Sequence, residues 1–182
     1  MKMFRLSVSL PVLLVVGSIG GCSGTSAKSP DVSDSIRASL DQTGLTKVSI
    51  SEDRDKGVVT LGGNVGNDGD KFRAETIAKS LSGALVVADQ IAVVPPGVER
   101  DAKAMNSDLD EGIGKNLDAA LIQNRFHDSV NYGVKNGVVT LTGEVNSQSK
   151  RTEAERTTAS VPNVQQVVNE LQVKDQKASS SN

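Results

Sequence analysis

The chain offers few side chains that could do catalytic chemistry. It contains one histidine, His127, in the run NRFHD, and one cysteine, Cys22. A lone histidine cannot hold a metal ion without further ligands, and a nucleophile–histidine pair needs a serine or threonine that the fold brings close. We therefore expect His127 to lie in a surface loop without a catalytic role. The sequence predicts no enzyme, no metal site and no cofactor.

The run NVGNDGDKFRAE matches a calcium-binding loop in part. Asn64, Asp68, Gly69 and Glu75 fall at ligand or turn positions of that loop, but Gly66 stands where an oxygen ligand is needed. Its glycines also lie between a predicted strand and a predicted helix, as in a phosphate-binding loop. The related run EVNSQSKRTEAE, 80 residues later, lacks the central glycine. We expect a polar turn that caps a helix, without metal or nucleotide.

Basic side chains on two predicted helices form the one candidate contact surface. In the second half of the chain these are Lys150, Arg151 and Arg156. The corresponding helix in the first half offers Lys71, Arg73 and Lys79. Such residues could meet lipid phosphates at the start and along one side of a helix. The alternative is a solvated surface of balanced charge, because Glu153 and Glu155 lie among the second set.

The first 22 residues indicate export. Lys2 and Arg5 precede an apolar run of about 15 residues and a small-residue exit, which is the layout of a secretory signal peptide. A membrane-spanning helix, the alternative, needs roughly 20 apolar residues. The run Ile19-Gly20-Gly21-Cys22 resembles the lipobox of bacterial lipoproteins, in which the cysteine takes a diacylglycerol and becomes the new N-terminus. The resemblance implies lipid attachment at Cys22; a free thiol is the alternative.

Charge and composition exclude several classes of partner. Without Lys2 and Arg5, 18 basic residues face 22 acidic ones, so the mature chain has a net charge of −4. That balance argues against nucleic acid, which demands a basic footprint. Only Phe72, Phe126 and Tyr132 remain as aromatic residues after the signal. Base-stacking platforms and aromatic sugar-binding clefts need more rings.

The run GVVTL occurs twice. It stands in KGVVTLGGNV from Lys56 and, 80 residues later, in NGVVTLTGEV from Asn136. Alternate residues of each run share one side of a strand, which predicts a core-facing side that includes Gly63 and Gly143. A glycine there has no Cβ, so we expect a helix to lie directly against the strand backbone at both positions.

Helical and strand patterns surround each copy of this run. The first helices carry apolar stripes formed by Val32, Ile36 and Leu40, and by Ile113, Leu117, Ala120 and Leu121. The second helices carry Ala74, Ile77, Ala78 and Leu81, and Ala154, Thr157, Thr158 and Val161. Asn136-Gly137 predicts a tight hairpin turn. Asp89 and Asn169 interrupt the closing strands at matching places, where we expect them to bond local backbone.

The predicted order is helix, strand, strand, helix, strand, twice over. This is an α+β fold of two tandem units, each a mixed three-stranded sheet with two helices on one face. Units of roughly 65 residues seldom have room for an enclosed active site. The opposite face of each sheet stays uncovered unless the units pack together there.

These patterns resemble the BON domain of bacterial osmotic-stress and nodulation proteins. The resemblance rests on NGVVTLTGEV, the basic helix with alanine, and SVPNVQQVVNELQV. The family's hallmark glycine corresponds to Gly63 and Gly143, and its closing-strand asparagine to Asn169, where the first copy has Asp89. The resemblance implies an αββαβ fold and a non-enzymatic module proposed to bind phospholipid. The overall layout is similar to that of dual-BON lipoproteins of the Gram-negative envelope, and Ser23 after the cysteine implies outer-membrane sorting.

The expected organisation follows. It comprises a lipoprotein signal peptide (1–22), a flexible tether (23–30), BON domain 1 (31–94), a linker (95–108), BON domain 2 (109–174) and a disordered tail (175–182). The function implied is that of a lipid-anchored periplasmic protein that binds phospholipid and serves envelope maintenance or stress tolerance. The alternative is a protein–protein interaction adaptor of the envelope, which would use uncovered sheet faces or basic helices and the membrane only as an anchor.

Overall fold

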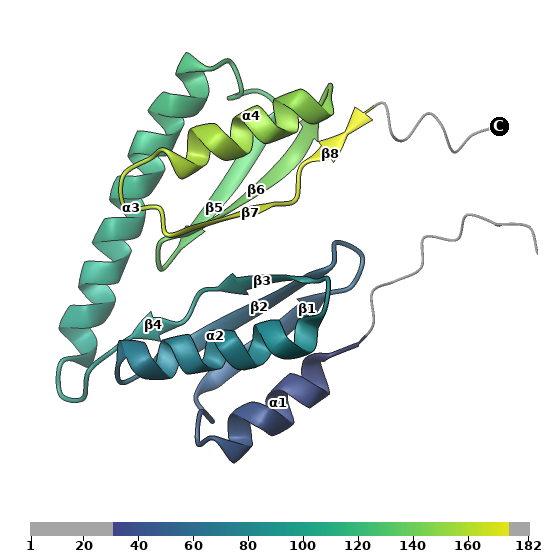
Figure 1. The fold of residues 1–182 in the computed structure, drawn as a ribbon. Coiled ribbons are helices and arrows are strands. Elements are labelled where there is room, and N and C mark those ends of the chain that lie inside the picture. The colour runs from purple at the N-terminus through teal and green to yellow at the C-terminus, as the bar shows by residue number, and fades with distance from the viewer. Residues whose placement is uncertain (1–30, 175–182) are drawn as a thin grey trace, which may run out of the picture.

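The computed structural model describes residues 31–174, which form two units of like architecture (Figure 1). The first unit contains α1 (Ser33–Gln42), β1 (Val48–Asp53), β2 (Val58–Val65), α2 (Asp68–Ser82), β3 (Val86–Asp89) and β4 (Ala92–Val93). The second contains α3 (Glu99–Gln123), β5 (Val130–Lys135), β6 (Val138–Val145), α4 (Gln148–Ala159), β7 (Gln166–Asn169) and β8 (Gln172–Val173). None of the described helices has the length and apolar character needed to cross a membrane. The predicted signal peptide, Cys22, tether and tail lie outside the described residues.

Each unit has the mixed sheet that the sequence predicts. β1 pairs antiparallel with β2, and the closing strand pairs parallel with β2 in two pieces, β3 and β4. The second unit repeats this arrangement with β5, β6, β7 and β8. The closing strands break where Asp89 and Asn169 stand. Their Oδ1 atoms accept hydrogen bonds from the backbone N–H of Ile91 (3.1 Å) and Leu171 (3.2 Å), so the predicted local bonding is confirmed.

Two helices cover one face of each sheet. Ile36 and Leu40 of α1 are fully buried with Val59 and Leu61 of β2, as the apolar stripe predicts. The prediction that Leu81 lies in the core is wrong. Leu81 is 37% exposed, because the inward side of α2 runs at four-residue spacing through Ala74, Ala78 and Ser82, and Ser82 is buried.

Polar turns cap the second helix of each unit, as expected for the runs before α2 and α4. The Asn67 side chain accepts a hydrogen bond from the backbone N–H of Asp70 (2.9 Å), and Ser147 does the same for Lys150 (3.2 Å). Among residues 31–174, no group of His, Cys, Asp and Glu side chains could hold a metal ion.

The segment predicted as a linker, 95–108, is mostly helical. α3 begins at Glu99 and continues unbroken to Gln123, so its first half precedes the stripe of Ile113, Leu117 and Leu121 that packs in the core. The run ERDAKAM consists of good helix formers except Asp101, whose charge is favourable in the first turn, and neither glycine nor proline occurs between Glu99 and Glu111. α1 has no corresponding extension within the described residues.

The two family glycines have a structural role, but not the one predicted. Gly63 has φ +85° and is exposed, and Gly143 has φ +118°. A Cβ would overlap the carbonyl oxygen of Lys47 at Gly63, and that of Ser129 at Gly143. The close approach is therefore to the chain just before the neighbouring strand, not to a helix. Both a positive φ and a lack of room require glycine here.

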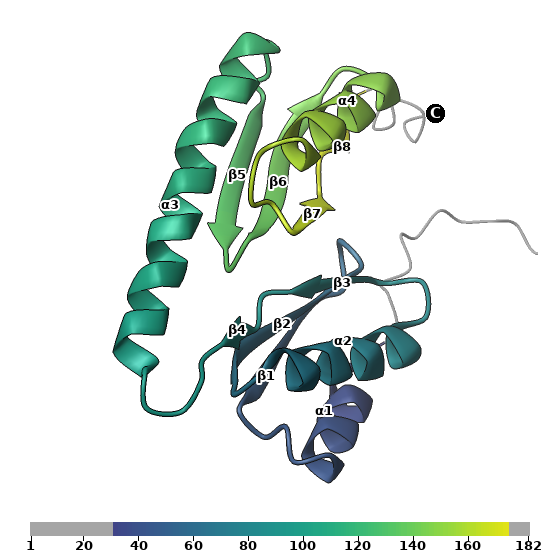
Figure 2. The ribbon, with the colours of Figure 1, turned by 60° about the vertical axis from the view of Figure 1, so that its left-hand side comes forward.

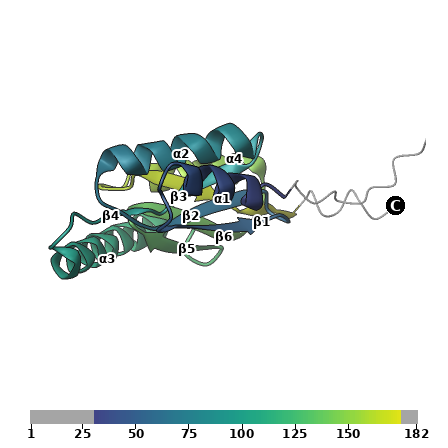
Figure 3. The ribbon, with the colours of Figure 1, turned by 90° about the horizontal axis from the view of Figure 1, so that it is seen from below.

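The two units pack against each other at one end of the opposite sheet faces. Val58 and Ala88 of the first unit form a buried cluster with Val138 and Val168 of the second. β3 and β7 lie side by side at this junction, as Figures 1 and 2 show. The expected covering of these faces by the other unit is therefore found at this end only, and Ser49 and Asn131 on the same faces are exposed. Seen from below, α2 and α4 lie on the same side of the two sheets (Figure 3).

The junction is reciprocal. Lys56 Nζ of the first unit lies 2.6 Å from Glu170 Oε2 of the second. At the corresponding positions, 80 residues away in each direction, Asn136 of the second unit donates to the Gln90 carbonyl of the first (2.8 Å). The same two repeat positions are thus in contact twice, with the roles of the two units exchanged. Contacts related in this way are typical of a two-fold interface. Here it forms within one chain.

Candidate functional site

The three basic residues predicted on α4 are not gathered on one side of the helix. Lys150 is exposed; its ammonium group lies 2.7 Å from Glu153 Oε2 and 5.1 Å from the centre of the Phe126 ring. Arg156 is also exposed and makes no side-chain hydrogen bond or ion pair within the described part of the chain. Six residues separate Lys150 from Arg156, which places them about a third of a turn apart around the axis.

Arg151 has a structural partner. Its Nη2 donates to the carbonyl oxygen of Asn169 (2.8 Å), and Asn169 Nδ2 donates to the Arg151 carbonyl (3.2 Å). Asn169 Nδ2 also lies 2.9 Å from Glu155 Oε2. These bonds fasten α4 to the end of β7. The Arg151 guanidinium is therefore less available to a ligand than that of Arg156.

α2 presents the counterpart residues together with an aromatic ring. Arg73 lies 3.5 Å from Asp70, and Lys79 lies 2.6 Å from Glu75, so both are balanced within the helix. Phe72 is 69% exposed, the highest among the exposed large apolar side chains. Sequence reasoning counted Phe72 only as a scarce aromatic. The exposure of Phe72 could have been predicted, because the corresponding residue on α4 is the polar Thr152, and polar residues usually occupy the exposed side of a helix.

We call the side of α2 and α4 that is turned away from the sheets the helical face; its candidate contact residues are Phe72, Arg73, Lys79 and Arg156, with Lys150 at its margin. α2 has three acidic and three basic residues, and α4 has two acidic and three basic ones. The two helices thus carry a net charge of +1, in contrast to the negative charge of the whole chain. Because α2 and α4 lie on the same side of the sheets, both can meet one flat surface (Figure 3).

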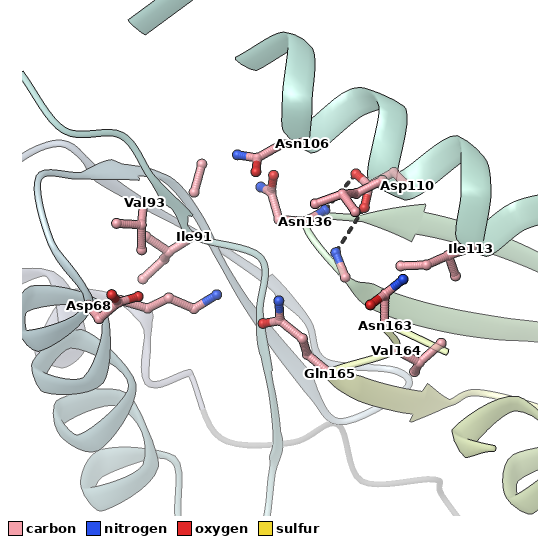
Figure 4. Close-up of a pocket in the computed structure, with 14 residues that line it drawn as sticks. Asp68, Ile91, Val93, Asn106, Asp110, Ile113, Asn136, Asn163, Val164 and Gln165 are labelled. Atoms are coloured by element: carbon pink, nitrogen blue, oxygen red, sulfur yellow. Dashed lines mark hydrogen bonds between the residues drawn. The ribbon is translucent and has the colours of Figure 1, made fainter. Parts of the chain in front are cut away.

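A cavity of about 450 Å³ lies between the two units (Figure 4). It is bounded by the start of α2, β4, α3, the β5–β6 turn and the loop before β7. Val93, Ile113 and Val164 supply apolar walls, and Asn106, Asn163 and Gln165 supply amide groups. Sequence reasoning missed this cavity, since its walls come from both halves of the chain and only the packing of the units brings them together.

A carboxylate on α3 orders one edge of this cavity. Both oxygens of Asp110 accept backbone hydrogen bonds from the β5–β6 turn, from Asn136 N–H (2.7 Å) and Gly137 N–H (2.9 Å). The two turn residues have φ of 49° and 78°, so the predicted Asn-Gly turn is confirmed. Asp110 thus fixes the position of α3 against the hairpin.

The titratable groups with altered pKa have structural explanations. Asp89 is only 6% exposed, and burial raises its pKa, although the Ile91 N–H and the charge of Lys71 oppose this shift. Partial burial, together with the neighbouring Asp118 carboxylate, raises the pKa of Tyr132 to about 12; its hydroxyl donates to the Gly114 carbonyl (3.0 Å). His127 is exposed, with Nδ1 3.5 Å from Asp128. None of these groups stands in an arrangement typical of acid–base catalysis.

Comparison with known proteins gives one family. A family model described as BON domain matches the chain twice, over residues 29–95 and 108–175. No curated protein matches the sequence. Two solved structures of CdsD, a structural protein of the type III secretion system of Chlamydia trachomatis, are each 16% identical to this chain. The first covers 81% of this chain and 99% of its own length with a TM-score of 0.34, and the second covers 79% and 94% with a TM-score of 0.36. Neither likeness is strong enough to support a functional argument.

Proposed function

Since this chain belongs to the BON-domain family and carries the domain twice, we propose that it is a lipid-anchored envelope protein that contacts phospholipid headgroups through the helical face. The proposal includes attachment through Cys22, a periplasmic location at the outer membrane, and a role in envelope maintenance or stress tolerance. BON is a non-catalytic domain type, which favours binding over an enzymatic function.

The observation that carries this proposal is the shared orientation of α2 and α4. A bilayer is planar, so a protein that contacts it through two domains needs both contact helices on the same side (Figure 3). Phe72 adds an exposed ring beside Arg73 on that side. Aromatic and basic side chains together favour the interface between headgroups and acyl chains.

The expected headgroup contact is weak. A basic residue near an anionic membrane contributes roughly 1 kcal/mol, and the acidic residues of α2 and α4 offset most of that attraction. The proposed anchor compensates through proximity. Eight residues, 23–30, join Cys22 to Asp31, so the two Cα atoms are at most about 30 Å apart, and the local concentration of lipid is high. Under this proposal the anchor holds the protein and the helical face orients it.

The test uses the chain from Ser23 onward, without an acyl group, in co-sedimentation with vesicles across a salt series. We expect weak binding to phosphatidylglycerol vesicles, weaker binding to phosphatidylcholine vesicles, and loss of the difference at high salt. The combined Arg73→Gln, Lys150→Gln and Arg156→Gln variant should lose most of the binding. Arg151 stays unchanged, because its replacement would free the end of β7. A matched control removes the same charge from α3 through Arg100→Gln, Lys103→Gln and Lys115→Gln.

Three outcomes contradict parts of the proposal. If the unaltered chain binds no vesicle even at low salt, direct lipid recognition is wrong and an adaptor role is favoured. If the helical-face variant binds as well as the control, lipid contact stays and the assigned surface is wrong. An unmodified Cys22 thiol, found by mass spectrometry in protein from the membrane fraction, contradicts the anchor.

A second candidate function, that of an interaction adaptor, is favoured by a different surface from the ones first expected. The apolar end of the opposite sheet faces is buried between the units at Val58, Ala88, Val138 and Val168, so it offers nothing to a partner. The first half of α3, by contrast, has apolar side chains that the described chain leaves exposed.

A further inference from the structure

The first half of α3 carries an apolar ridge that no described residue covers. Met105 is 64% exposed, Leu109 47%, and Val98, at the N-cap, 44%; Ala102 is half-buried between them. Spacings of four, three and four residues place all four on one side of the helix. Surface apolar residues are ordinary when scattered, but a continuous row of them marks an interaction site.

This exposed ridge points in a different direction from the buried apolar stripe of α3. The buried residues Ile113, Leu117 and Leu121 lie on a side turned roughly a quarter of the circumference from Met105 and Leu109, at 3.6 residues per turn. Leu109 also lines the cavity between the units. The ridge therefore borders an existing hollow, and the apolar surface continues inward to Val93, Ile113 and Val164 (Figure 4).

Acidic side chains border the ridge. Asp101 and Asp108 are seven residues apart, so they lie along the same margin, two turns from each other. Asp68 and Asp110 line the hollow on the other margin, with Lys71 as its one basic lining residue within the described chain. Arg100 lies on the far side of the helix, and Lys103 lies on the Asp110 margin, where Glu99 and Asp110 outnumber it.

This border decides which occupant fits. An antiparallel pair of copies joined through the ridge would set Asp101 and Asp108 of both against each other. A parallel pair would set them against the margin of Glu99, Lys103 and Asp110, whose net charge is −1, so neither pairing is favoured by charge. An anionic bilayer would be repelled by the same carboxylates. A cationic segment gains from the same charges, and the row of anchors at Val98, Ala102, Met105 and Leu109 has the spacing used when one helix lies along another.

We propose that the ridge from Val98 to Leu109 docks a cationic amphipathic helix of another envelope protein. The exposed half of α3, from Glu99 to Gly112, is about 20 Å long, so it matches a partner helix of about four turns. An interface of this length is smaller than a standard stable one, which makes the expected association reversible. This surface is separate from the helical face, so the inference does not depend on the proposed headgroup contact; the envelope location of the partner and the anchor used in the test rest on the proposed function.

The test measures binding of a probe to the whole protein. The full chain, carrying its anchor, is placed in nanodiscs of neutral phosphatidylcholine. The probe is a fluorescent 16-residue synthetic helix with leucine on one side and lysine on the others, and empty nanodiscs give the background. We expect the combined Met105→Ser and Leu109→Ser variant to weaken binding at least about tenfold. The combined Asp101→Asn and Asp108→Asn variant should weaken it a few-fold and flatten its salt dependence.

Matched controls carry the same changes elsewhere. Ile122→Ser removes a similarly exposed apolar side chain (59%) near the other end of α3, and Asp34→Asn with Asp128→Asn removes two exposed carboxylates; these variants should bind like the unaltered protein. All replaced side chains are exposed, so thermal melting should stay within a few degrees, which verifies folding. A probe with glutamate in place of lysine should bind far more weakly.

The proposal is overturned if the α3 variants bind the lysine probe as the controls do, or if the glutamate probe binds equally well. Light scattering that shows a dimer, dissociated by Met105→Ser and Leu109→Ser, would make a second copy the occupant instead. Loss of phosphatidylglycerol binding in that same variant would make the ridge a lipid surface.

Discussion

The two units have the same elements in the same order and differ where they meet. In the 80-residue repeat, Lys56 corresponds to Asn136, Val86 to Gln166, and Gln90 to Glu170. The core stripes are kept, yet the contacts across the junction are made once by an ion pair and once by a side-chain amide bonded to a carbonyl. The comparison teaches that burial constrains the duplicated core, whereas each side of the junction has acquired its own polar chemistry.

The second unit also carries the larger share of the connections. Gln166 donates to the Val87 carbonyl (2.6 Å) and accepts from the Asp89 N–H (3.0 Å), so its amide covers the free edge of β3. Its counterpart Val86 is 47% exposed and has no polar side-chain atoms to do the same for β7. The side chains that make these contacts thus come more from the second unit than from the first.

The largest effect is expected where the units are alike. Gly143→Ala and Gly63→Ala both force a Cβ into a backbone carbonyl at positive φ, so each should lower the free energy of unfolding by about 3 kcal/mol or more. Chemical denaturation followed by circular dichroism measures this loss. Gly112→Ala is the control, because a Cβ at Gly112 meets nothing within 4 Å and a helix favours alanine. Equal stability of all three variants would refute the steric account.

A smaller effect should separate the two sides of the junction. Gln166→Ala removes both bonds to β3 and leaves buried edge groups without partners, which should cost about 2 kcal/mol. Val86→Ala, at the corresponding exposed position, should cost less than about 0.5 kcal/mol. Comparable losses in the two variants, measured by the same denaturation, would show that the junction is held equally from both sides.

Asp89 and its counterpart Asn169 offer a pH-dependent comparison. Burial raises the pKa of Asp89 above its ordinary value of 3.8, so its charged form is disfavoured in the folded state. Asp89→Asn keeps an oxygen for the Ile91 N–H and should stabilise the protein by about 1 kcal/mol at neutral pH.

The direction in which stability changes with pH follows from the linkage between folding and proton binding. The folded state binds the Asp89 proton more tightly than the unfolded state, so this group's contribution to stability falls as pH rises from 3.8 through the raised value. The advantage of Asp89→Asn should therefore shrink as pH is lowered through that window and vanish below 3.8. Thermal melting between pH 3 and 7 checks it. An advantage that is constant with pH would mean that the gain does not come from the charge.

The smallest effect is expected at the ion pair. Lys56→Ala should cost about 1 kcal/mol: solvent screens the lysine side chain, which is 44% exposed, but Glu170 is only 10% exposed and loses its cation. The loss should decrease further in high salt. Asn136→Ala, across the junction, removes an uncharged bond to Gln90, so its cost should not depend on salt. A salt-independent effect of Lys56→Ala would contradict the assigned role of the charge.

The element order, the family and the turn at Asn136-Gly137 could be derived from the sequence, because apolar spacing and turn chemistry act locally. Asp89 and Asn169 were correctly expected to bond local backbone for the same reason. The expected helix contact was wrong at both Gly63 and Gly143 for one reason. The lack of a Cβ at Gly63 is visible in the sequence, but its positive φ and the nearby Lys47 carbonyl depend on strand pairing.

What depended on tertiary packing could not be predicted from residue types. The basic residues of α4 formed a cluster in the sequence, yet Arg151 turns to the Asn169 carbonyl and Lys150 to Glu153. The composition of residues 99–108 favours a helix, but the first repeat has no corresponding helical segment within the described residues with which to compare it. The cavity and the reciprocal junction are formed by residues that are far apart in the chain, and no sequence pattern marks these residues as neighbours.

The central claim is that helices of both units face one membrane. The chain from Ser23 onward has no cysteine, so single cysteines can be labelled at Thr76 on α2, Thr152 on α4, Ser49 on β1 and Asn131 on β5. Each labelled protein is held on phosphatidylglycerol vesicles by an N-terminal histidine tag and a nickel-chelating lipid, and nitroxide headgroup lipids quench the dye. We predict strong quenching at Thr76 and Thr152 together, and weak quenching at Ser49 and Asn131, which lie on the opposite sheet faces. Quenching on the helix of only one unit, or equal quenching on the sheets, would contradict the account.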